Sequence, residues 1–210
     1  AQDIVKCEYQ SDANTVLLLH MNENSGSTVS DSSSLGNNGI ATGTTIVDGR
    51  FGKARSFANV FNNIPVDFIT INNAPALNPP NAMTIEAWIK LSASSDGWPN
   101  GIPLINRDDS WGGTLGYNTN IVGSWNGLNF YDGDLSVASS QGLSINRWYH
   151  LAFVLESSGG TKTVRIFLDG KLVDTQTVSG ALRTNDLVTY VGRRWGSYGG
   201  FPYNSGFAGL

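Results

Sequence analysis

Aromatic side chains are concentrated in two stretches of this sequence that are otherwise rich in Gly, Asn and Ser, at residues 98–125 and 195–203. A flat ring can pack against the C–H face of a sugar, while neighbouring planar polar groups bind the hydroxyls. Apolar walls with a few placed polar groups are the usual composition of a ligand site. The side chains that could form such a site are Trp98, Arg107, Asp109, Trp111, Tyr117, Trp125, Arg194, Trp195 and Tyr198. Alternatively, these rings pack beneath their own loops or form a partner interface, where Trp, Tyr and Arg are also enriched.

A second group of polar side chains lies in residues 22–39, NENSGSTVSDSSSLGNNG. Calcium takes about six to eight oxygen ligands from carboxylates, amides and backbone carbonyls. Asn22, Asp31 and Asn37 offer that chemistry, and we expect a structural calcium ion that ties this loop to a sheet. The alternative is a loop held by the hydrogen bonds of Asx turns, without a metal.

The carboxylates of the chain do not form a catalytic pattern. Retaining glycosidases place two carboxyl groups about 5–5.5 Å apart. The glutamates are far apart in the sequence, at Glu8, Glu23, Glu86 and Glu156. His20 and His150 lie within apolar strands, where we expect buried structural imidazoles. We therefore predict no catalytic residues.

Charge and composition exclude several classes of function. The net charge of −4 provides no basic stripe for nucleic acid, and no apolar run approaches the ~20 residues of a membrane span. The single cysteine, Cys7, excludes an internal disulfide, which leaves a free thiol or a bond to another chain. The chain begins with Ala1 rather than Met, which is typical of an exported protein after removal of its signal peptide.

Residues 148–177 give the clearest secondary-structure pattern and predict three consecutive strands. Asp169-Gly170 is a strong hairpin signal between the second and third of them, because a type I′ turn needs positive φ at both positions. Trp148 begins the first of these strands, and Trp88 lies in the middle of an earlier one. Both are expected to belong to the hydrophobic core.

Short apolar or alternating segments recur along the rest of the chain, separated by Gly- and Asn-rich turns. We expect strands at 14–21, 44–47, 54–60, 68–71, 82–91, 102–107, 114–120, 127–131, 135–139 and 186–191, and an aromatic loop at 192–206. Charged residues make up only 14% of the chain, whereas long helices are built largely from Ala, Leu, Glu and Lys. The pattern predicts an all-β protein with an antiparallel β-sandwich or jelly roll.

Seven short motifs occur in an order and spacing that one known family shares. They are LHMNENSG at 19–26, VSDSSSLGNNG at 29–39, GKARSF at 52–57, MTIEAWIKL at 83–91, NRWYHLAFV at 146–154, VRIFLDGKLV at 164–173 and YVGR at 190–193. In these motifs the chain resembles laminin-G-like domains of the concanavalin A-like lectin/glucanase type, common in bacterial secreted and surface proteins. The resemblance implies a concanavalin A-like jelly roll over residues 14–210, after a lead-in at 1–13.

The resemblance has two further implications. Asp31 matches a position that often binds a structural calcium in the family, whereas Asn22 stands where the family often has Asp. The family also continues with one more strand after the position of Gly209-Leu210, which is expected to leave a sheet edge open beside residues 14–21. The chain is then a fragment of a longer protein, or its last strand is missing here, or a neighbouring chain supplies a strand.

These observations predict a non-catalytic extracellular or cell-surface binding module, carbohydrate-binding or adhesive, with a structural calcium. The expected partners are a glycan or a surface protein, together with self-association through the open edge; neither nucleic acid nor membrane insertion is expected. The alternative is a structural subunit of a surface assembly or filament, whose aromatic loops and open edge form the contacts between chains. The fold alone does not decide between them.

Overall fold

The computed structural model describes residues 8–59, 66–94, 101–107, 116–123, 126–132, 136–198 and 201–210; for residues 140, 195–198 and 201–205 only the backbone is described. Short antiparallel strands dominate these residues. They are β1 (Thr28–Val29), β2 (Gly39–Thr42), β3 (Thr45–Asp48), β4 (Lys53–Ala58), β5 (Phe68–Ile71), β6 (Ala82–Lys90), β7 (Ile102–Asn106), β8 (Asn118–Val122), β9 (Gly127–Tyr131), β10 (Ser136–Gly142), β11 (Trp148–Ser158), β12 (Thr161–Leu168), β13 (Lys171–Ser179), β14 (Thr189–Val191), β15 (Arg193–Tyr198), β16 (Phe201–Gly206) and β17 (Ala208–Gly209), with one 3-10 turn, η1 (Pro75–Leu77).

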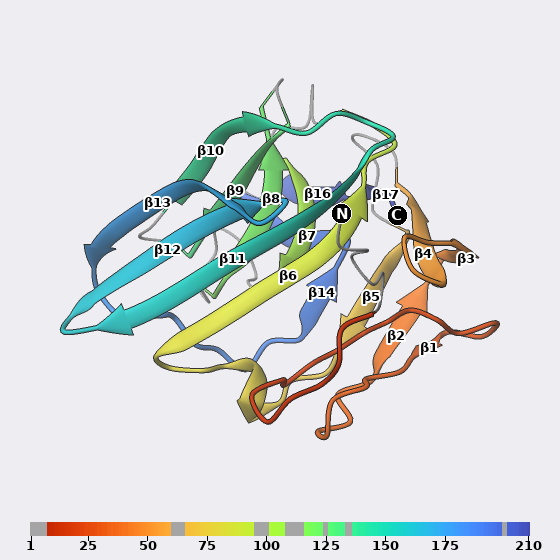
Figure 1. Cartoon of the computed structure of the whole chain (residues 1–210), viewed down its shortest axis with the longest axis horizontal. Helices are drawn as coiled ribbons and strands as arrows, with labels where there is room; N and C mark the ends of the chain where they lie inside the picture. The colour runs from red at the N-terminus through yellow and green to blue at the C-terminus, as the bar shows by residue number, and fades with distance from the viewer. Residues whose placement is uncertain are drawn as a thin grey trace, which may run out of the picture.

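Two sheets form the two layers of a sandwich. The smaller sheet has the order β13-β12-β11-β6, and the larger has the order β1-β2-β5-β14-β7-β8-β9-β10. Figure 1 shows the four-stranded sheet in front, with its strands running diagonally across the larger sheet behind. A short sheet, β17-β4-β3, and the hairpin β15-β16 complete the fold. The predicted all-β, antiparallel sandwich is confirmed.

The hydrophobic core lies between the two layers and follows from the alternation of side chains along the strands. In β11, Leu151, Phe153 and Leu155 are each at most 2% exposed, so every second side chain points inward. Phe130 of β9 packs against Phe153 across the two layers, with ring centroids 6.4 Å apart. The side chains between these positions therefore lie on the outer face of the sheet, which sets the location of any surface site.

The meander β11-β12-β13 confirms the three strands predicted at residues 148–177. β11 pairs with β12 from Leu151–Leu168 to Ser158–Thr161, and β12 pairs with β13. At the turn between β12 and β13, Asp169 has φ 49° and Gly170 has φ 76°. Both φ angles are positive, as the two-residue hairpin signal predicts.

Two parts of the predicted secondary structure are wrong. Residues 14–21 form no strand, because their only ladder contact is an isolated bridge between Leu19 and Asp31. Residues 192–206 are not a loop, since β15 and β16 pair as a hairpin from Arg193–Gly206 to Tyr198–Phe201. In addition, the polar loop expected at 22–39 contains β1 (Thr28–Val29), which pairs with β2, and β2 itself begins at Gly39.

The open edge expected beside residues 14–21 is not found there, because these residues form no strand. The outer edge of the four-stranded sheet is instead β6. On its inner side β6 pairs with β11 along its whole length. On its other side Lys90 exchanges backbone hydrogen bonds of 2.9 Å with Leu210, in both directions. No strand of the described residues lies beside the rest of that edge, from Ala82 to Ile89. No helix among the described residues is long and apolar enough to cross a membrane.

Candidate functional site

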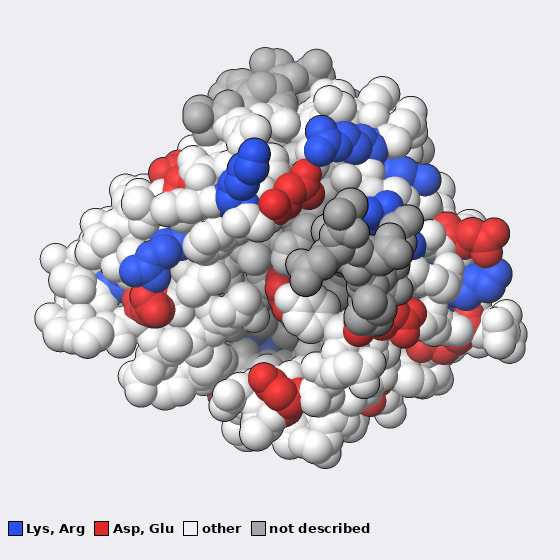
Figure 2. Space-filling model, viewed as in Figure 1, with Lys and Arg blue, Asp and Glu red and all other residues white. Residues whose placement is uncertain are grey.

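An open hollow of about 610 Å³ lies on the outer face of the four-stranded sheet, at the end where β6 finishes and β11 begins. Figure 2 views this face and shows Lys and Arg side chains gathered toward its upper right, with acidic groups between them. The hollow, called here the Trp88 hollow, is lined by Arg50, Trp88, Arg147, Trp148, His150 and Asp169.

Strand alternation places the aromatic floor of the Trp88 hollow. Ile89 of β6 and Tyr149 of β11 point into the core and are about 5% exposed or less. Trp88, Trp148 and His150 therefore point outward. In the antiparallel register Trp88 lies opposite His150, and Lys90 lies opposite Trp148. The two indoles are thus diagonal neighbours on adjacent strands.

Ring contacts fix the orientation of Trp88. The imidazole of His150 lies 5.3 Å from the indole at an interplanar angle of 50°. Phe51 approaches from the turn between β3 and β4, edge-on at 5.7 Å. Such offset and edge-to-face arrangements are favourable for aromatic pairs. Trp88 is consequently a half-buried ring held in place from two sides.

Two cations lie over the indole rings. The guanidinium of Arg50 is 5.0 Å from the Trp88 ring and 5.6 Å from the Phe51 ring. The ammonium of Lys90 is 5.4 Å from the Trp148 ring. At exposed sites a contact of this kind contributes about 0.5–1 kcal/mol, so both cations are held only weakly where they lie.

Glu86 anchors the imidazole of His150. Its Oε2 lies 3.3 Å from His150 Nε2 and accepts a hydrogen bond of 2.9 Å from the Tyr9 hydroxyl. The hydrogen bond with His150 lowers the pKa of the Glu86 carboxyl, against an opposing effect of burial. Glu86 is therefore ionised at neutral pH, with its charge directed at groups of the protein.

The hairpin turn supplies the other carboxylate of the hollow. Asp169 Oδ1 accepts a hydrogen bond of 3.0 Å from the His150 backbone N–H, and Oδ2 accepts one of 3.1 Å from Arg147 Nη2. The Asp169 N–H in turn donates to the His150 carbonyl at 2.8 Å. The turn is thereby tied to β11 beside the aromatic floor.

The described residues of the predicted aromatic-loop site lie in the interior. Arg107 is fully buried, and its guanidinium donates to Asn78 Oδ1 at 3.0 Å and to Thr189 Oγ1 at 2.9 Å. Tyr117 is 7% exposed, and burial raises the pKa of its hydroxyl. Arg194 is also 7% exposed. Burial corrects the prediction for all three residues, because none of these side chains is available to a ligand at the surface.

The other residues predicted for that site are not described in full. Trp98, Asp109, Trp111 and Trp125 lie outside the described residues, as does Cys7. For Trp195 and Tyr198 the structure describes the backbone, in β15, but not the side chain. The ligand site in these loops therefore stays a prediction.

The predicted calcium loop is organised around the Asp31 carboxylate. Oδ1 accepts hydrogen bonds from the backbone N–H groups of Leu18 at 2.8 Å and Ser33 at 2.9 Å. Oδ2 accepts from Ser33 Oγ at 2.6 Å and from the Asn37 N–H at 2.7 Å. Burial favours the neutral carboxyl, but these hydrogen bonds outweigh it and lower the pKa of Asp31.

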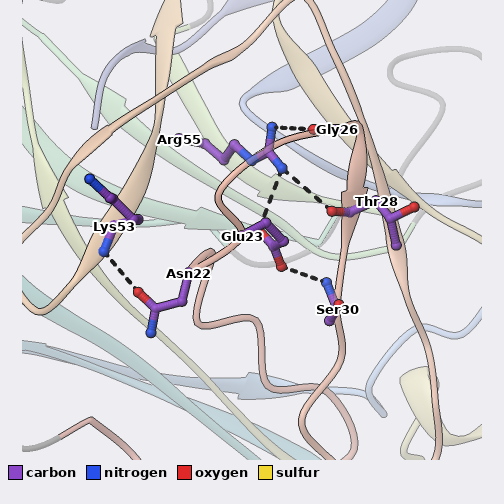
Figure 3. A network of polar contacts seen from close by, with 7 residues as sticks. All are labelled: Asn22, Glu23, Gly26, Thr28, Ser30, Lys53 and Arg55. Atoms are coloured by element: carbon purple, nitrogen blue, oxygen red, sulfur yellow. Dashed lines mark hydrogen bonds and ion pairs between the residues drawn. The ribbon is translucent and has the colours of Figure 1, made fainter.

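The other two predicted ligands are also engaged by the protein. Asn37 Nδ2 donates to the Val16 carbonyl at 2.8 Å, and Asn22 Oδ1 accepts from the Lys53 N–H at 2.8 Å. Figure 3 shows Asn22 directed at Lys53, and Glu23 between the Ser30 N–H and the guanidinium of Arg55. Within the described part of the chain no group of three His, Cys, Asp or Glu side chains could hold a metal ion. As arranged, Asn22, Asp31 and Asn37 do not fit a calcium ion, since a cation would have to displace these hydrogen bonds.

Sequence reasoning assigned the main residues of the Trp88 hollow elsewhere. Trp88 and Trp148 were expected in the core, and His150, like His20, as a buried imidazole. The structure places Trp88, Trp148 and both imidazoles in half-buried positions; the His20 ring lies 3.7 Å from a Glu8 carboxylate oxygen. The signal that could have found the hollow is present in β6, where Ile85 and Ile89 alternate with Glu86 and Trp88. An indole on the same side as a glutamate belongs to the outer face.

Two antiparallel sheets packed face to face, with an aromatic hollow on an outer face, define a β-sandwich of the lectin-like kind. A model of the concanavalin A-like lectin/glucanases superfamily, of the laminin G type, matches residues 66–210. The chain belongs to this family.

Comparison with solved structures and curated proteins adds the following. One similar solved structure is the native heptameric SAP-like pentraxin from Limulus polyphemus, with 15% sequence identity and a TM-score of 0.46 over 73% of this chain and 70% of that chain. No curated protein matches the sequence.

Proposed function

We propose that this protein is a non-catalytic, extracellular carbohydrate-binding module and that the Trp88 hollow is its binding site. The observation that carries the proposal is the pair of outward-facing indoles, Trp88 and Trp148, on adjacent strands. Diagonal neighbours on adjacent strands are about 7–8 Å apart at the backbone, which allows one short saccharide to touch both rings.

The composition of the hollow suits a sugar better than a purely apolar ligand. A pyranose presents an apolar C–H face to an aromatic ring and hydroxyl groups around its rim. Trp88 and Trp148 supply rings, while Arg147 and Asp169 supply donors and acceptors at the margin. Aromatic anchors with a few placed polar groups fix the orientation of a ligand and give it specificity.

The carboxylates of the hollow support a non-catalytic function. A glycosidase needs a general acid whose pKa is raised, so that it is protonated at the working pH. The pKa of Glu86 is instead lowered by its hydrogen bond with His150. Both oxygens of Asp169 accept hydrogen bonds from the protein. Neither group is prepared to donate a proton to a glycosidic oxygen.

Affinity electrophoresis in gels that contain polysaccharides tests the site. The Trp88→Ala and Trp148→Ala variants are expected to bind about 10- to 100-fold more weakly, as expected for the loss of a central aromatic anchor. Leu172→Ala is a matched control, because Leu172 is a large exposed apolar side chain of β13, in the same sheet but separated from β11 by β12. Circular dichroism of each variant checks that the fold is retained.

The same assay tests the competing hypothesis that the ligand binds to the loop tryptophans. If Trp98→Ala, Trp111→Ala or Trp125→Ala abolishes retardation in the gel and Trp88→Ala does not, the site lies in the predicted loops. Unchanged retardation in all five tryptophan variants would exclude both sites.

Self-association through the β6 edge is a second candidate function, which suits a surface subunit. It is favoured by the hydrogen bonds between Lys90 and Leu210, which begin a ladder on the outer side of β6. In an antiparallel strand the groups that face one side recur at every second residue, so the N–H of Thr84 faces the same side as that of Lys90. An added strand, supplied by a second copy, would extend the ladder along this edge.

A proline at Thr84 tests this second function, because edge strands tolerate Pro and lose only one outward donor. Sedimentation analysis over a range of concentrations is expected to show association of the parent chain and weaker association of Thr84→Pro. A parent chain that stays monomeric at all concentrations excludes the edge as a contact between copies.

A further inference from the structure

We infer that the Trp88 hollow selects acidic saccharides, that is, sugars that carry a carboxylate or a sulfate. This inference rests on the proposed function and specifies its ligand class. The observation behind it is an imbalance among the charged groups in and beside the hollow. The carboxylates of Asp169 and the adjacent Glu86 accept hydrogen bonds from the protein, whereas Arg50 and the adjacent Lys90 contact no carboxylate among the described residues.

The carboxylates near the rings already accept hydrogen bonds from groups of the protein. Glu86 Oε2 contacts His150 Nε2 and accepts from the Tyr9 hydroxyl. Both oxygens of Asp169 are occupied, one by the His150 N–H and the other by the guanidinium of Arg147. Each of these carboxylates is therefore already engaged by the protein before a ligand arrives.

The positive charges are different. Among the described residues, Arg50 and Lys90 contact no carboxylate within 4.0 Å, and each lies over an indole ring. Arg147 is paired with Asp169 through Nη2 and its side chain is 63% exposed, which leaves donors of its guanidinium facing solvent. Three cations thus surround the two rings on which a sugar would pack.

The position of Arg50 over Trp88 explains how the hollow would distinguish acidic sugars from neutral ones. A sugar that packs on the face of Trp88 covered by Arg50 must displace the guanidinium from the ring. A neutral sugar offers no anion in exchange, so the cation–π contact is lost. An acidic sugar offers a carboxylate or sulfate, with which Arg50 forms a charge-assisted, bidentate pair beside the ring. The displacement is compensated only in the second case.

The preference is local to the hollow and is not a property of the whole chain. The protein has a net charge of −4, so its overall field repels polyanions. At physiological ionic strength, exposed charges act over about 8 Å, so the nearby cations affect a bound ligand more than distant charges do. The rings favour a saccharide over an acidic peptide, because a pyranose face can cover an indole while its anionic group reaches Arg50.

Two matched polymer pairs test the inference. Polygalacturonate is compared with its methyl-esterified form, and dextran sulfate with dextran, by affinity electrophoresis of the parent chain. Within each pair the backbone is the same and the charge is removed. We expect at least fivefold stronger retardation by one acidic member or both; the pair that responds identifies carboxylate or sulfate as the recognised group. Polyglutamate serves as the peptide probe and is expected to cause no retardation.

The variants separate charge recognition from ring recognition. Arg50→Gln and Lys90→Gln are expected to weaken binding of the acidic polymer about threefold to tenfold each, as for an exposed or partly desolvated ion pair. Arg50→Lys is expected to restore part of the lost affinity. Arg165→Gln is the control, because Arg165 pairs with Glu156 at the opposite end of the same sheet, about 27 Å along β11 from Trp148.

Each failure has a distinct meaning. Equal binding of acidic and neutral polymers, lost in Trp88→Ala and unchanged in Arg50→Gln, overturns the acidic preference and leaves the carbohydrate site standing. Retardation by polyglutamate as strong as by the acidic polysaccharide shows recognition of charge alone and also overturns the inference. No retardation by any of the polymers overturns both the ligand class and the proposed function.

Discussion

The loop around Asp31 and the Trp88 hollow are both rich in polar side chains, but they differ in where their polar groups are directed. In the loop, both oxygens of Asp31 accept hydrogen bonds from the segments that the carboxylate joins. In and beside the hollow, Arg50 and Lys90 lie over rings without a carboxylate partner among the described residues. The first region uses polarity to hold the chain together, whereas the second has cations whose described contacts are with rings and not with carboxylates. A concentration of polar residues is therefore not by itself a site; the direction of the donors and acceptors decides.

The largest effect that separates the two regions is expected from Asp31→Ala. Removal of the Asp31 carboxylate leaves the N–H groups of Leu18, Ser33 and Asn37 without their acceptor. Because the site is partly exposed, water replaces some of these contacts, and we expect a loss of about 2–3 kcal/mol in the free energy of unfolding. Urea denaturation measures this loss, and polysaccharide binding by the folded variant is expected to be unchanged. A variant of unaltered stability would show that the Asp31 hydrogen bonds contribute nothing to the fold.

Trp88→Ala is expected to have the opposite effects, a large loss of binding and a small loss of stability. Binding falls about 10- to 100-fold, whereas the free energy of unfolding falls by only about 1–2 kcal/mol, because the ring is half-buried and loses contacts with Phe51 and His150. The fully buried Phe153 provides the comparison: Phe153→Ala is expected to cost about 3–5 kcal/mol. Equal losses of stability in the two variants would place Trp88 in the core after all.

The pH dependence of stability sharpens the comparison further. The folded-state pKa of Asp31 lies below its ordinary value near 3.8, since hydrogen bonds outweigh burial. The stabilisation is present above the unfolded-state pKa and is lost as the pH falls through the lower folded-state value. The stability advantage of the parent over Asp31→Asn is thus expected at pH 7 and is expected to shrink below about pH 4. Thermal melts of both proteins from pH 7 to pH 2.5 measure it; a constant difference contradicts the assignment.

The smallest expected effect is that of chelation. The oxygens of Asn22 and Asp31 are engaged by the protein, so we expect EDTA to shift the melting temperature by less than about 1 °C. A ligand at a free concentration 100 times its dissociation constant adds about 2.7 kcal/mol to the free energy of unfolding. At this chain length that corresponds to a rise of several degrees in melting temperature. A calcium-dependent shift of that size would restore the calcium prediction and require the loop to rearrange.

Local patterns in the sequence predict much of the fold. β5 and β9 have the predicted bounds, and the Asp169-Gly170 turn has the predicted backbone, because alternation and turn chemistry are encoded within a few residues. Residues 14–21 fail as a strand because strand formation needs a partner, and apolar composition does not provide one. The β15-β16 hairpin was missed because Gly, Pro and aromatic residues dominate its sequence.

The candidate site was only partly predictable. The outward position of Trp88 follows from its alternation with Ile85 and Ile89, and could have been read from β6 alone. The position of Arg50 over this ring could not have been read from the sequence, because the tertiary fold brings the turn between β3 and β4 to β6. Likewise, the fit of the Asn22–Asn37 oxygens to a metal depends on hydrogen bonds with Leu18 and Lys53, which no local pattern reveals.

The pairing of β6 with β11 has a consequence for the order in which the protein assembles. β11, β12 and β13 are joined by tight turns and can pair locally, whereas Trp88 and His150 are about 60 positions apart in sequence, and closing so long a loop carries a larger entropic cost. We therefore expect the Trp148 side of the hollow to form early in folding and the Trp88 side to form later. A ligand that touches both rings is retained only by molecules in which this late pairing is complete. Binding of such a ligand should slow amide hydrogen exchange in β6 more than in the β12-β13 hairpin, because the ligand would stabilise the pairing of β6 with β11.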